Sequence, residues 1–176
     1  MKINRQLAKQ AKEKGICKDW FKDLEQTENI TDLIQMYLKG IDFCLANDFP
    51  SNDFIRKHFK GKMEDFGIFL DGSFQLKNKS KCVLLGNCKG ILAIDQYNTS
   101  EVFVKHQSEI IVEAKDNAFV MIDLFDDAVL RIHALGDAKI CVNQYQGKSQ
   151  IHQTKSENAQ IKIITKNKKN ILAISL

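Results

Sequence analysis

A ten-residue repeat between Ser108 and Tyr145 is the feature that most constrains how this chain can fold. Four segments begin with a small residue, and apolar residues follow two and four positions later. The first residues are Ser108, Ala118, Ala128 and Ala138, and the apolar pairs are Ile110 and Val112, Val120 and Ile122, Leu130 and Ile132, and Ile140 and Val142. A unit this short cannot bury its own apolar face, so its copies must stack on one another.

The repeat continues on both sides of this stretch. Upstream, Ser80, Gly90 and Ser100 each precede apolar residues, although Ser100 lies only eight residues before Ser108. Downstream, Ala159 precedes Ile161 and Ile163. Within each segment the apolar residues alternate with other residues, which is the pattern of a β-strand. Asp, Asn and Gly separate the segments, and these residue types favour turns.

Two architectures fit strands at this spacing. In a parallel β-solenoid, successive segments lie on opposite walls, and one coil takes two segments. In an antiparallel β-meander, successive segments pair as hairpins and curl into a sandwich. No Asn-Gly or Asp-Gly turn separates these segments, and Ala recurs at the same place. Both observations favour the solenoid, with Val102, Val120 and Ile140 stacked on one wall and Ile110 and Leu130 on the other.

Residues 1–77 have a different pattern and predict a helical head. Ile3, Leu7 and Ala11 recur at helical spacing, and a stripe that includes Cys17 and Trp20 follows. The helix stop signals are Gly15 and Gly40, and the candidate N-caps are Thr31 for one helix and Ser51 or Asn52 for another. Asp71-Gly72 predicts a short β-hairpin at the end of the head. The expected fold is therefore α+β, with a head over 1–77 and a β-repeat body over 78–176.

Composition supports a folded chain in a reducing compartment. Apolar residues make up 44% of the sequence, charged residues 27%, and the net charge is +4. No apolar run is long enough to span a bilayer, so we expect no membrane insertion. The start of the sequence has no apolar core of the signal-peptide type. The five cysteines are an odd number, which together with this start predicts free thiols in the cytoplasm.

Two stretches resemble a family of small proteins from gut Bacteroidales and their phages and mobile elements. The first is YLKGIDFCLANDFPSNDFIRKHFKG at residues 37–61. The second comprises EVFVKH at 101–106 and NAFVMIDLFDDA at 117–128. The family has no established activity, so the resemblance assigns no catalytic residue. It implies a bacterial or phage origin and a helical head on a β-repeat body.

Metal and catalytic motifs are weak in this sequence. Cys82 and Cys88 do not have the spacing of a zinc ligand pair, and no second pair accompanies them. The acidic residues Asp116, Asp123, Asp126, Asp127 and Asp137 lie in or near turns, without the glycine-rich repeat of calcium-binding β-rolls. Cys17, Cys44 and Cys141 could act as nucleophiles, but Cys17 and Cys44 lie in apolar helical patterns typical of core cysteine. We therefore assign no catalytic residue, metal or cofactor.

Nucleic-acid binding is also disfavoured. The most basic segment carries Lys162, Lys166, Lys168 and Lys169. Clustered positive charge attracts phosphate, but the segment lacks interleaved aromatic residues for base stacking. A solvated end of the repeat explains these lysines equally well.

The most specific functional prediction concerns one outer wall of the solenoid. Counting three positions from each small residue places an apolar column on that wall, made of Val83, Phe103, Met121 and Cys141, with Phe119 beside it. A row of exposed apolar groups must be covered, either by the chain's own helical head or by a second copy or a partner protein, and we favour self-association. We expect a non-enzymatic binding or scaffold protein that forms a homo-oligomer or binds a protein partner. The alternatives are a phage-encoded inhibitor that sequesters a host defence protein or small ligand, and an enzyme with a site between head and body.

Overall fold

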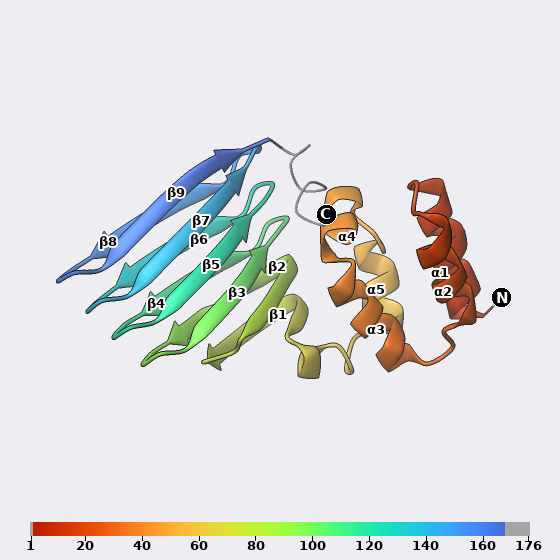
Figure 1. The fold of residues 1–176 in the computed structure, drawn as a ribbon, viewed down its shortest axis with the longest axis horizontal. Helices are drawn as coiled ribbons and strands as arrows, with labels where there is room; N and C mark the ends of the chain where they lie inside the picture. Colours follow the sequence, from red (N-terminus) through yellow and green to blue (C-terminus); the bar gives the residue numbers. More distant parts are fainter. Residues whose placement is uncertain (1, 168–176) are drawn as a thin grey trace. The chain divides into compact units, whose positions relative to one another are not determined.

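A computed structural model describes residues 2–167 of the chain. The described residues form two compact units, 2–66 and 67–167 (Figure 1). The first unit is helical, and the second is built from β-strands. The α+β class and the order of helical head and β-repeat body are therefore confirmed.

The head consists of five α-helices and one short 3-10 helix in its described residues. They are α1 (Ile3–Glu13), α2 (Lys18–Gln26), α3 (Ile30–Lys39), α4 (Ile41–Asn47), α5 (Asn52–His58) and η1 (Glu64–Phe66). Helix α1 buries Leu7 and Ala11, as its periodicity predicts. Gly40 separates α3 from α4, also as predicted. Short amphipathic helices of this kind depend on one another for burial of their apolar faces.

The helix caps are partly as predicted. The Ser51 hydroxyl accepts a hydrogen bond from the Phe54 amide, which confirms Ser51 as the N-cap of α5. The prediction of Thr31 as the N-cap of α3 is wrong. The cap is Asn29, whose side-chain oxygen accepts from the Thr31 amide at 2.7 Å. Asn at this position satisfies an amide that the helix leaves unpaired, so the helix begins earlier than expected.

The body is a parallel β-solenoid. Its strands are β1 (Ile68–Lys77), β2 (Lys81–Ile94), β3 (Thr99–Val104), β4 (Glu109–Ala114), β5 (Phe119–Leu124), β6 (Val129–Ala134), β7 (Lys139–Tyr145), β8 (Gln150–Lys155) and β9 (Gln160–Lys166). Strands β3, β5, β7 and β9 stack on one wall, and β4, β6 and β8 stack on the other. The long strand β2 contributes to both walls, since it pairs with β3 and with β4.

This pairing excludes the meander. Strand β4 pairs with β2 and β6, and β5 pairs with β3 and β7, all in parallel. Phe119 lies beside Lys139, so neighbours in the stack are twenty residues apart in sequence. The predicted placements of Val120 beside Ile140 and of Ile110 beside Leu130 are both confirmed. Val102 lies on the predicted wall, but its stacking on Val120 is wrong, because it pairs with Ile122.

The core of the body lies between the two walls. All eight apolar residues of the four central pairs are buried, and Ile110, Val120 and Ile132 have no exposed surface. Alternation along each strand sends these residues inward and their neighbours outward. Full burial of a side chain of this size contributes about 1.5–3 kcal/mol relative to exposure. This apolar core holds the walls together.

The predicted register is wrong for the first coils. Ser100 pairs with Val120 and Gly90 pairs with Ile110, so neither is equivalent to the small residues that open the later segments. The equivalent residues are Cys88 and Asn98, since the carbonyl of Asn98 accepts from the Phe119 amide as that of Ala118 accepts from Lys139. Asn98 is polar and larger than Ala, which hid the unbroken ten-residue spacing from Cys88 to Ala138.

The hairpin predicted at Asp71-Gly72 does not form. Strand β1 runs through both residues and pairs with β2 in parallel, with a register shift between Leu70 and Gly72. Asp71 and Gly72 both have positive φ, as the sequence Asp-Gly predicts. This left-handed backbone forms a bulge at a corner of the coil instead of a hairpin turn. The sheet therefore begins at Ile68, ahead of the seam expected near residue 78.

Candidate functional site

An exposed apolar patch lies on the outer wall formed by β3, β5, β7 and β9. Phe119 and Met121 point outward from β5 and are 40% and 42% exposed. Cys141 lies beside Met121 in the neighbouring strand and is half-buried. These three residues form what we call the wall patch. They were among the predicted interface residues, and they remain accessible on the surface.

Val83 and Phe103 do not belong to the wall patch, and the predicted single column is wrong. Phe103 pairs with Asp123, whereas Met121 pairs with Glu101. The predicted column thus combined residues of two separate columns. The cause is that Ser80 and Ser100 were taken as the first residues of their segments, which is two positions out of register. Val83 is fully buried and Phe103 is 2% exposed, so neither offers a free surface.

Charged residues border the wall patch along the direction of stacking. The column that contains Met121 and Cys141 has Glu101 on one side and Lys162 on the other. Glu101 also pairs with Lys81 at 2.8 Å, and both side chains are partly exposed. An exposed ion pair of this kind contributes little to stability. Glu101 therefore remains available for a contact outside the molecule.

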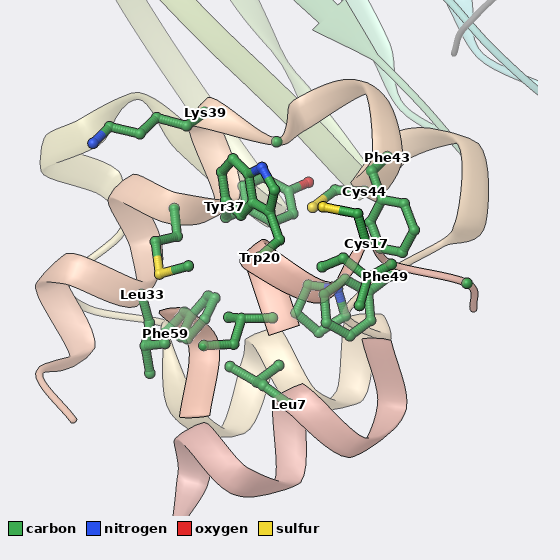
Figure 2. A pocket seen from close by; sticks show the side chains of 16 residues that line it. Leu7, Cys17, Trp20, Leu33, Tyr37, Lys39, Phe43, Cys44, Phe49 and Phe59 are labelled. Carbon is green, nitrogen blue, oxygen red and sulfur yellow. The ribbon is translucent and has the colours of Figure 1, made fainter. Parts of the chain in front are cut away.

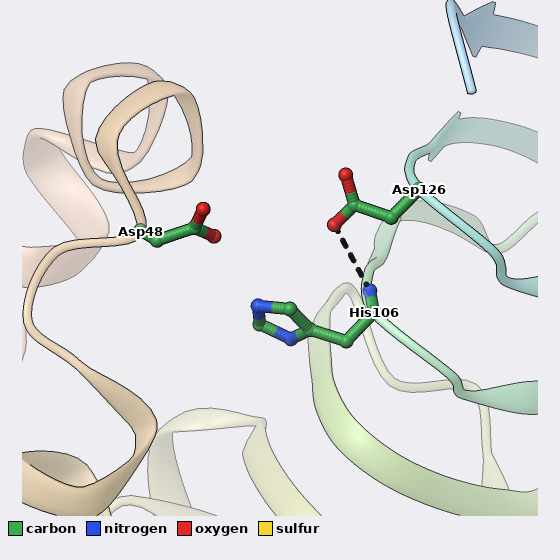
Figure 3. Close-up of side chains that lie close together, drawn as sticks. All are labelled: Asp48, His106 and Asp126. Atoms are coloured by element: carbon green, nitrogen blue, oxygen red, sulfur yellow. Dashed lines mark hydrogen bonds between the residues drawn. The ribbon is translucent and has the colours of Figure 1, made fainter.

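The turns between the walls carry a ladder of polar contacts. The His106 amide donates to Oδ2 of Asp126 at 3.3 Å, as Figure 3 shows. Asp126 also pairs with the buried ammonium group of Lys105 at 3.0 Å. Lys105 lies over the ring of Phe125, and Phe125 stacks on Tyr145 with ring centroids 4.5 Å apart. This corner is a continuous stack of interacting side chains, which indicates a structural role.

Three of the other acidic residues considered as calcium ligands also have partners within the body. Asp116 accepts from the Gln96 amide, Asp123 accepts from the Asn143 side chain at 2.6 Å, and Asp137 accepts from the Asn158 side chain at 3.0 Å. Each of these contacts joins successive coils. The clustering of Asp in the sequence thus reflects turn conformation and coil-to-coil hydrogen bonds.

A shallow groove crosses the opposite wall. His133 and Thr154 lie in it, with Nδ1 of the imidazole 2.7 Å from the threonine hydroxyl. Both residues are exposed. Activation of a hydroxyl nucleophile requires a base held in place by a third group in a site that excludes water. This open groove lacks that enclosure, so it gives no reason to prefer an enzyme.

The head contains an apolar cavity of about 260 Å³ (Figure 2). Its lining comes from α1 to α4, from the segments that join the helices, and from Phe59 at the end of α5. The aromatic residues of the lining are Trp20, Tyr37, Phe43, Phe49 and Phe59. Leu7, Leu33 and Phe59 are nearly fully buried, whereas Cys17 and Lys39 are exposed, so the cavity opens to solvent at their side.

Tyr37 brings a polar group into this apolar cavity. The residue is only 6% exposed, and its hydroxyl lines the cavity without a hydrogen-bond partner among the described residues. Burial, with smaller contributions from Cys44 and Asp48, raises the pKa of Tyr37 well above its usual value. The hydroxyl therefore keeps its proton and remains a hydrogen-bond donor.

The sequence did not reveal this cavity. Its residues come from four helices with no fixed spacing, and a buried aromatic residue in a helical stripe usually indicates core packing. The available signal was the concentration of aromatic residues in so short a head, which includes the single tryptophan of the chain.

The candidate nucleophilic cysteines fall in different environments. Cys44 is buried, and burial raises the pKa of its thiol. Cys17 precedes α2 and is exposed at the cavity opening, contrary to the expectation of a core position. In the body, burial raises the pKa of Cys82 to about 12 and that of Cys88 to about 11. A buried thiol of this kind is a poor nucleophile at neutral pH.

The basic segment is only partly described. Lys162 is exposed and Lys166 is half-buried on β9, with its ammonium group over the Tyr145 ring. Lys168 and Lys169 lie outside the described residues. The contact with Tyr145 gives Lys166 a role within the body.

Comparison with models of known protein families, with curated proteins and with solved structures found no match. The resemblance to the Bacteroidales and phage family therefore stays a prediction. Within residues 2–167, each helix is too short or too polar to cross a bilayer.

Proposed function

We propose that the body is a non-enzymatic binding and scaffold module whose wall patch binds a second copy of this chain. The observation that supports the proposal is the order Glu101, Met121, Cys141, Lys162 in one column of the outer wall. Two less polar residues stand at its centre, with opposite charges at its two ends. Such a column is complementary to itself when it is reversed.

A two-fold axis provides this reversal. Most homodimers use one patch twice, so that residue i of one copy meets residue j of the other and j meets i. An axis parallel to the strands, level with the midpoint between β5 and β7, places Met121 opposite Cys141 of the second copy. The same axis places Glu101 opposite Lys162. The apolar pairs lose contact with water, and the charges pair at the rim.

The neighbouring column fits the same arrangement. Phe119 and Lys139 are adjacent in it and both point outward, so the axis places Phe119 of each copy opposite Lys139 of the other. An ammonium group over an aromatic ring is attracted to it, which adds to the burial of apolar surface. The two columns thus support one geometry.

Charge reversal tests this geometry. Glu101→Lys places two lysines opposite each other and should shift the protein to monomer. Glu101→Lys combined with Lys162→Glu restores opposite charges at both ends and should restore the dimer. Glu113→Lys makes the same change at an exposed position on the opposite wall and serves as the control. Molar mass across a concentration series, by light scattering, measures the outcome.

Replacement of the apolar centre gives a second measurement. Phe119→Glu with Met121→Glu should abolish the dimer and leave the fold intact, because both side chains are exposed. Phe103 is unsuitable for this purpose because it is buried. A parent protein that is monomeric at all concentrations would overturn the proposal, as would a dimer unaffected by both the charge reversal and the patch replacement.

A further inference from the structure

The head cavity is too large to be an ordinary packing defect. Protein interiors are close-packed, and their few voids are rarely larger than a water molecule. A cavity of about 150 Å³ lined by apolar side chains holds benzene. The cavity in the head has about 260 Å³, enough for a single substituted ring. Its size is therefore that of a small ligand site.

The chemistry of the lining restricts what can enter. Among the described residues that line the cavity, Lys39 is the one charged residue, and Figure 2 shows its side chain extended away from the others. A charged ligand would lose its hydration without finding a counter-charge inside, which is costly. The ligand must therefore be neutral in its buried part.

The aromatic side chains favour a flat ring. Phe43 and Phe49 already pack edge to face, with ring centroids 5.7 Å apart at an interplanar angle of 67°. Aromatic groups prefer such offset or edge-to-face arrangements, and each pair adds attraction beyond the burial of area. A ring in the cavity would have Trp20, Tyr37 and Phe59 as further neighbours.

Tyr37 selects for one polar atom on that ring. A hydroxyl that lines a cavity and has no protein partner can donate to a ligand that places an acceptor oxygen beside it. The Tyr37 hydroxyl has no partner among the described residues, and it lines the cavity. We propose that the head binds a small, neutral aromatic molecule with an oxygen that accepts a hydrogen bond from Tyr37. This site is separate from the wall patch, and its test does not depend on dimer formation.

A matched pair of probes separates the two parts of this proposal. Acetophenone carries a carbonyl oxygen on a single ring. α-Methylstyrene has the same shape, with a methylene group in place of that oxygen. Calorimetric titration of the full chain should show that both bind. Acetophenone should bind about fivefold to tenfold more tightly, which is the usual effect of one neutral hydrogen bond.

Substitution of Tyr37 completes the cycle. Tyr37→Phe removes the hydroxyl and keeps the ring, so acetophenone affinity should fall to that of α-methylstyrene, whose own affinity should stay the same. Tyr97→Phe makes the same change at an 83% exposed position of the body and should alter neither affinity.

Cys17 reports where the ligand binds. Its thiol is exposed at the cavity opening, so bound acetophenone should slow its alkylation by N-ethylmaleimide. Cys141→Ser removes the other accessible thiol and leaves Cys17 as the reacting group. In this background, Leu24→Phe fills part of the cavity and should weaken both probes. If Leu24→Phe fails to fold, protection of Cys17 still locates the site.

Three results would overturn the inference. One is the absence of binding by both probes at millimolar concentration. A second is equal affinity of the two probes with no effect of Tyr37→Phe, which would remove the hydrogen bond from the site. The third is binding that leaves Cys17 alkylation unchanged, which would place the ligand elsewhere.

Discussion

Oδ2 of Asp116 accepts a hydrogen bond from the Gln96 amide at 3.0 Å, across one coil of the solenoid. Asp116 itself has a positive φ of 59°, a conformation that Asp and Asn adopt more readily than most residues. The contact between Asp126 and the His106 amide repeats the arrangement at the opposite corner. One residue thus makes the turn and joins it to the preceding turn.

This relationship predicts the effect of changes at Asp116. Asp116→Ala removes the acceptor and leaves a residue that disfavours positive φ, so the free energy of unfolding should fall by about 1–2 kcal/mol. Asp116→Asn keeps an acceptor oxygen and tolerates the conformation, so its effect should stay within about 0.5 kcal/mol. Urea denaturation measures both.

Asp116→Gly separates the two contributions. Glycine adopts positive φ without strain, but like alanine it lacks the acceptor. The free energy of unfolding of this variant should therefore lie between those of Asp116→Asn and Asp116→Ala. Equal stability of the Ala and Gly variants would mean that positive φ at this turn carries no cost.

The sequence predicted the body well because its physical determinants are local. Alternation along each strand and the repeated Ala at each corner follow from burial between two walls, and both are visible in the sequence. The first coils were read out of register because Asn98 occupies the place of the small residue. Its side-chain amide donates to the Asp95 carbonyl at 2.8 Å, so a polar residue is satisfied within the turn. Such a contact has no periodic signature.

The candidate sites depend on tertiary structure and were harder to predict. Met121 and Cys141 were placed correctly on one outer face because the ten-residue spacing holds between them. Phe103 was wrongly assigned to the column of Met121, because the register error shifted the predicted pairing by two residues. The cavity around Tyr37 depends on how four short helices pack, and residue spacing alone does not determine that packing.

Gly90 provides a test of the corrected register. It pairs with Phe74 of β1 and with Ile110 of β4. A Cβ atom at Gly90 would lie 2.3 Å from the Phe74 carbonyl oxygen and 2.8 Å from its ring. The absence of a side chain at Gly90 therefore leaves room for the Phe74 ring at the start of the stack. Gly90→Ala should destabilise the body by several kcal/mol, because the backbone of β1 must move.

Two comparisons make the Gly90 prediction specific. Gly90→Ala with Phe74→Ala should remain unstable, since the carbonyl oxygen still blocks the Cβ atom. Gly61→Ala adds a methyl group in open space at a glycine of the head with positive φ, so its cost should come from conformation alone, about 1 kcal/mol. Thermal melting monitored by circular dichroism measures all three, and a Gly90→Ala protein as stable as the parent would contradict the pairing with Phe74.

The buried thiols of the body predict how stability depends on pH. Burial raises the pKa of Cys82 to about 12 and that of Cys88 to about 11. In the unfolded chain a thiol ionises near pH 8.5. Above about pH 8.5 the unfolded chain therefore releases protons that the folded chain retains. The free energy of unfolding should fall as pH rises, by roughly 1.4 kcal/mol per pH unit for each thiol.

Removal of these thiols should reduce that slope. Cys82→Ala with Cys88→Ala leaves no thiol at either buried position, so the fall in stability between about pH 9 and pH 10.5 should become shallower. Cys141→Ala removes one half-buried thiol from the outer wall and controls for the loss of a cysteine as such. Urea denaturation at several pH values gives the slope directly. A slope that is the same in the parent and the double variant would show that Cys82 and Cys88 ionise alike in the folded and unfolded states.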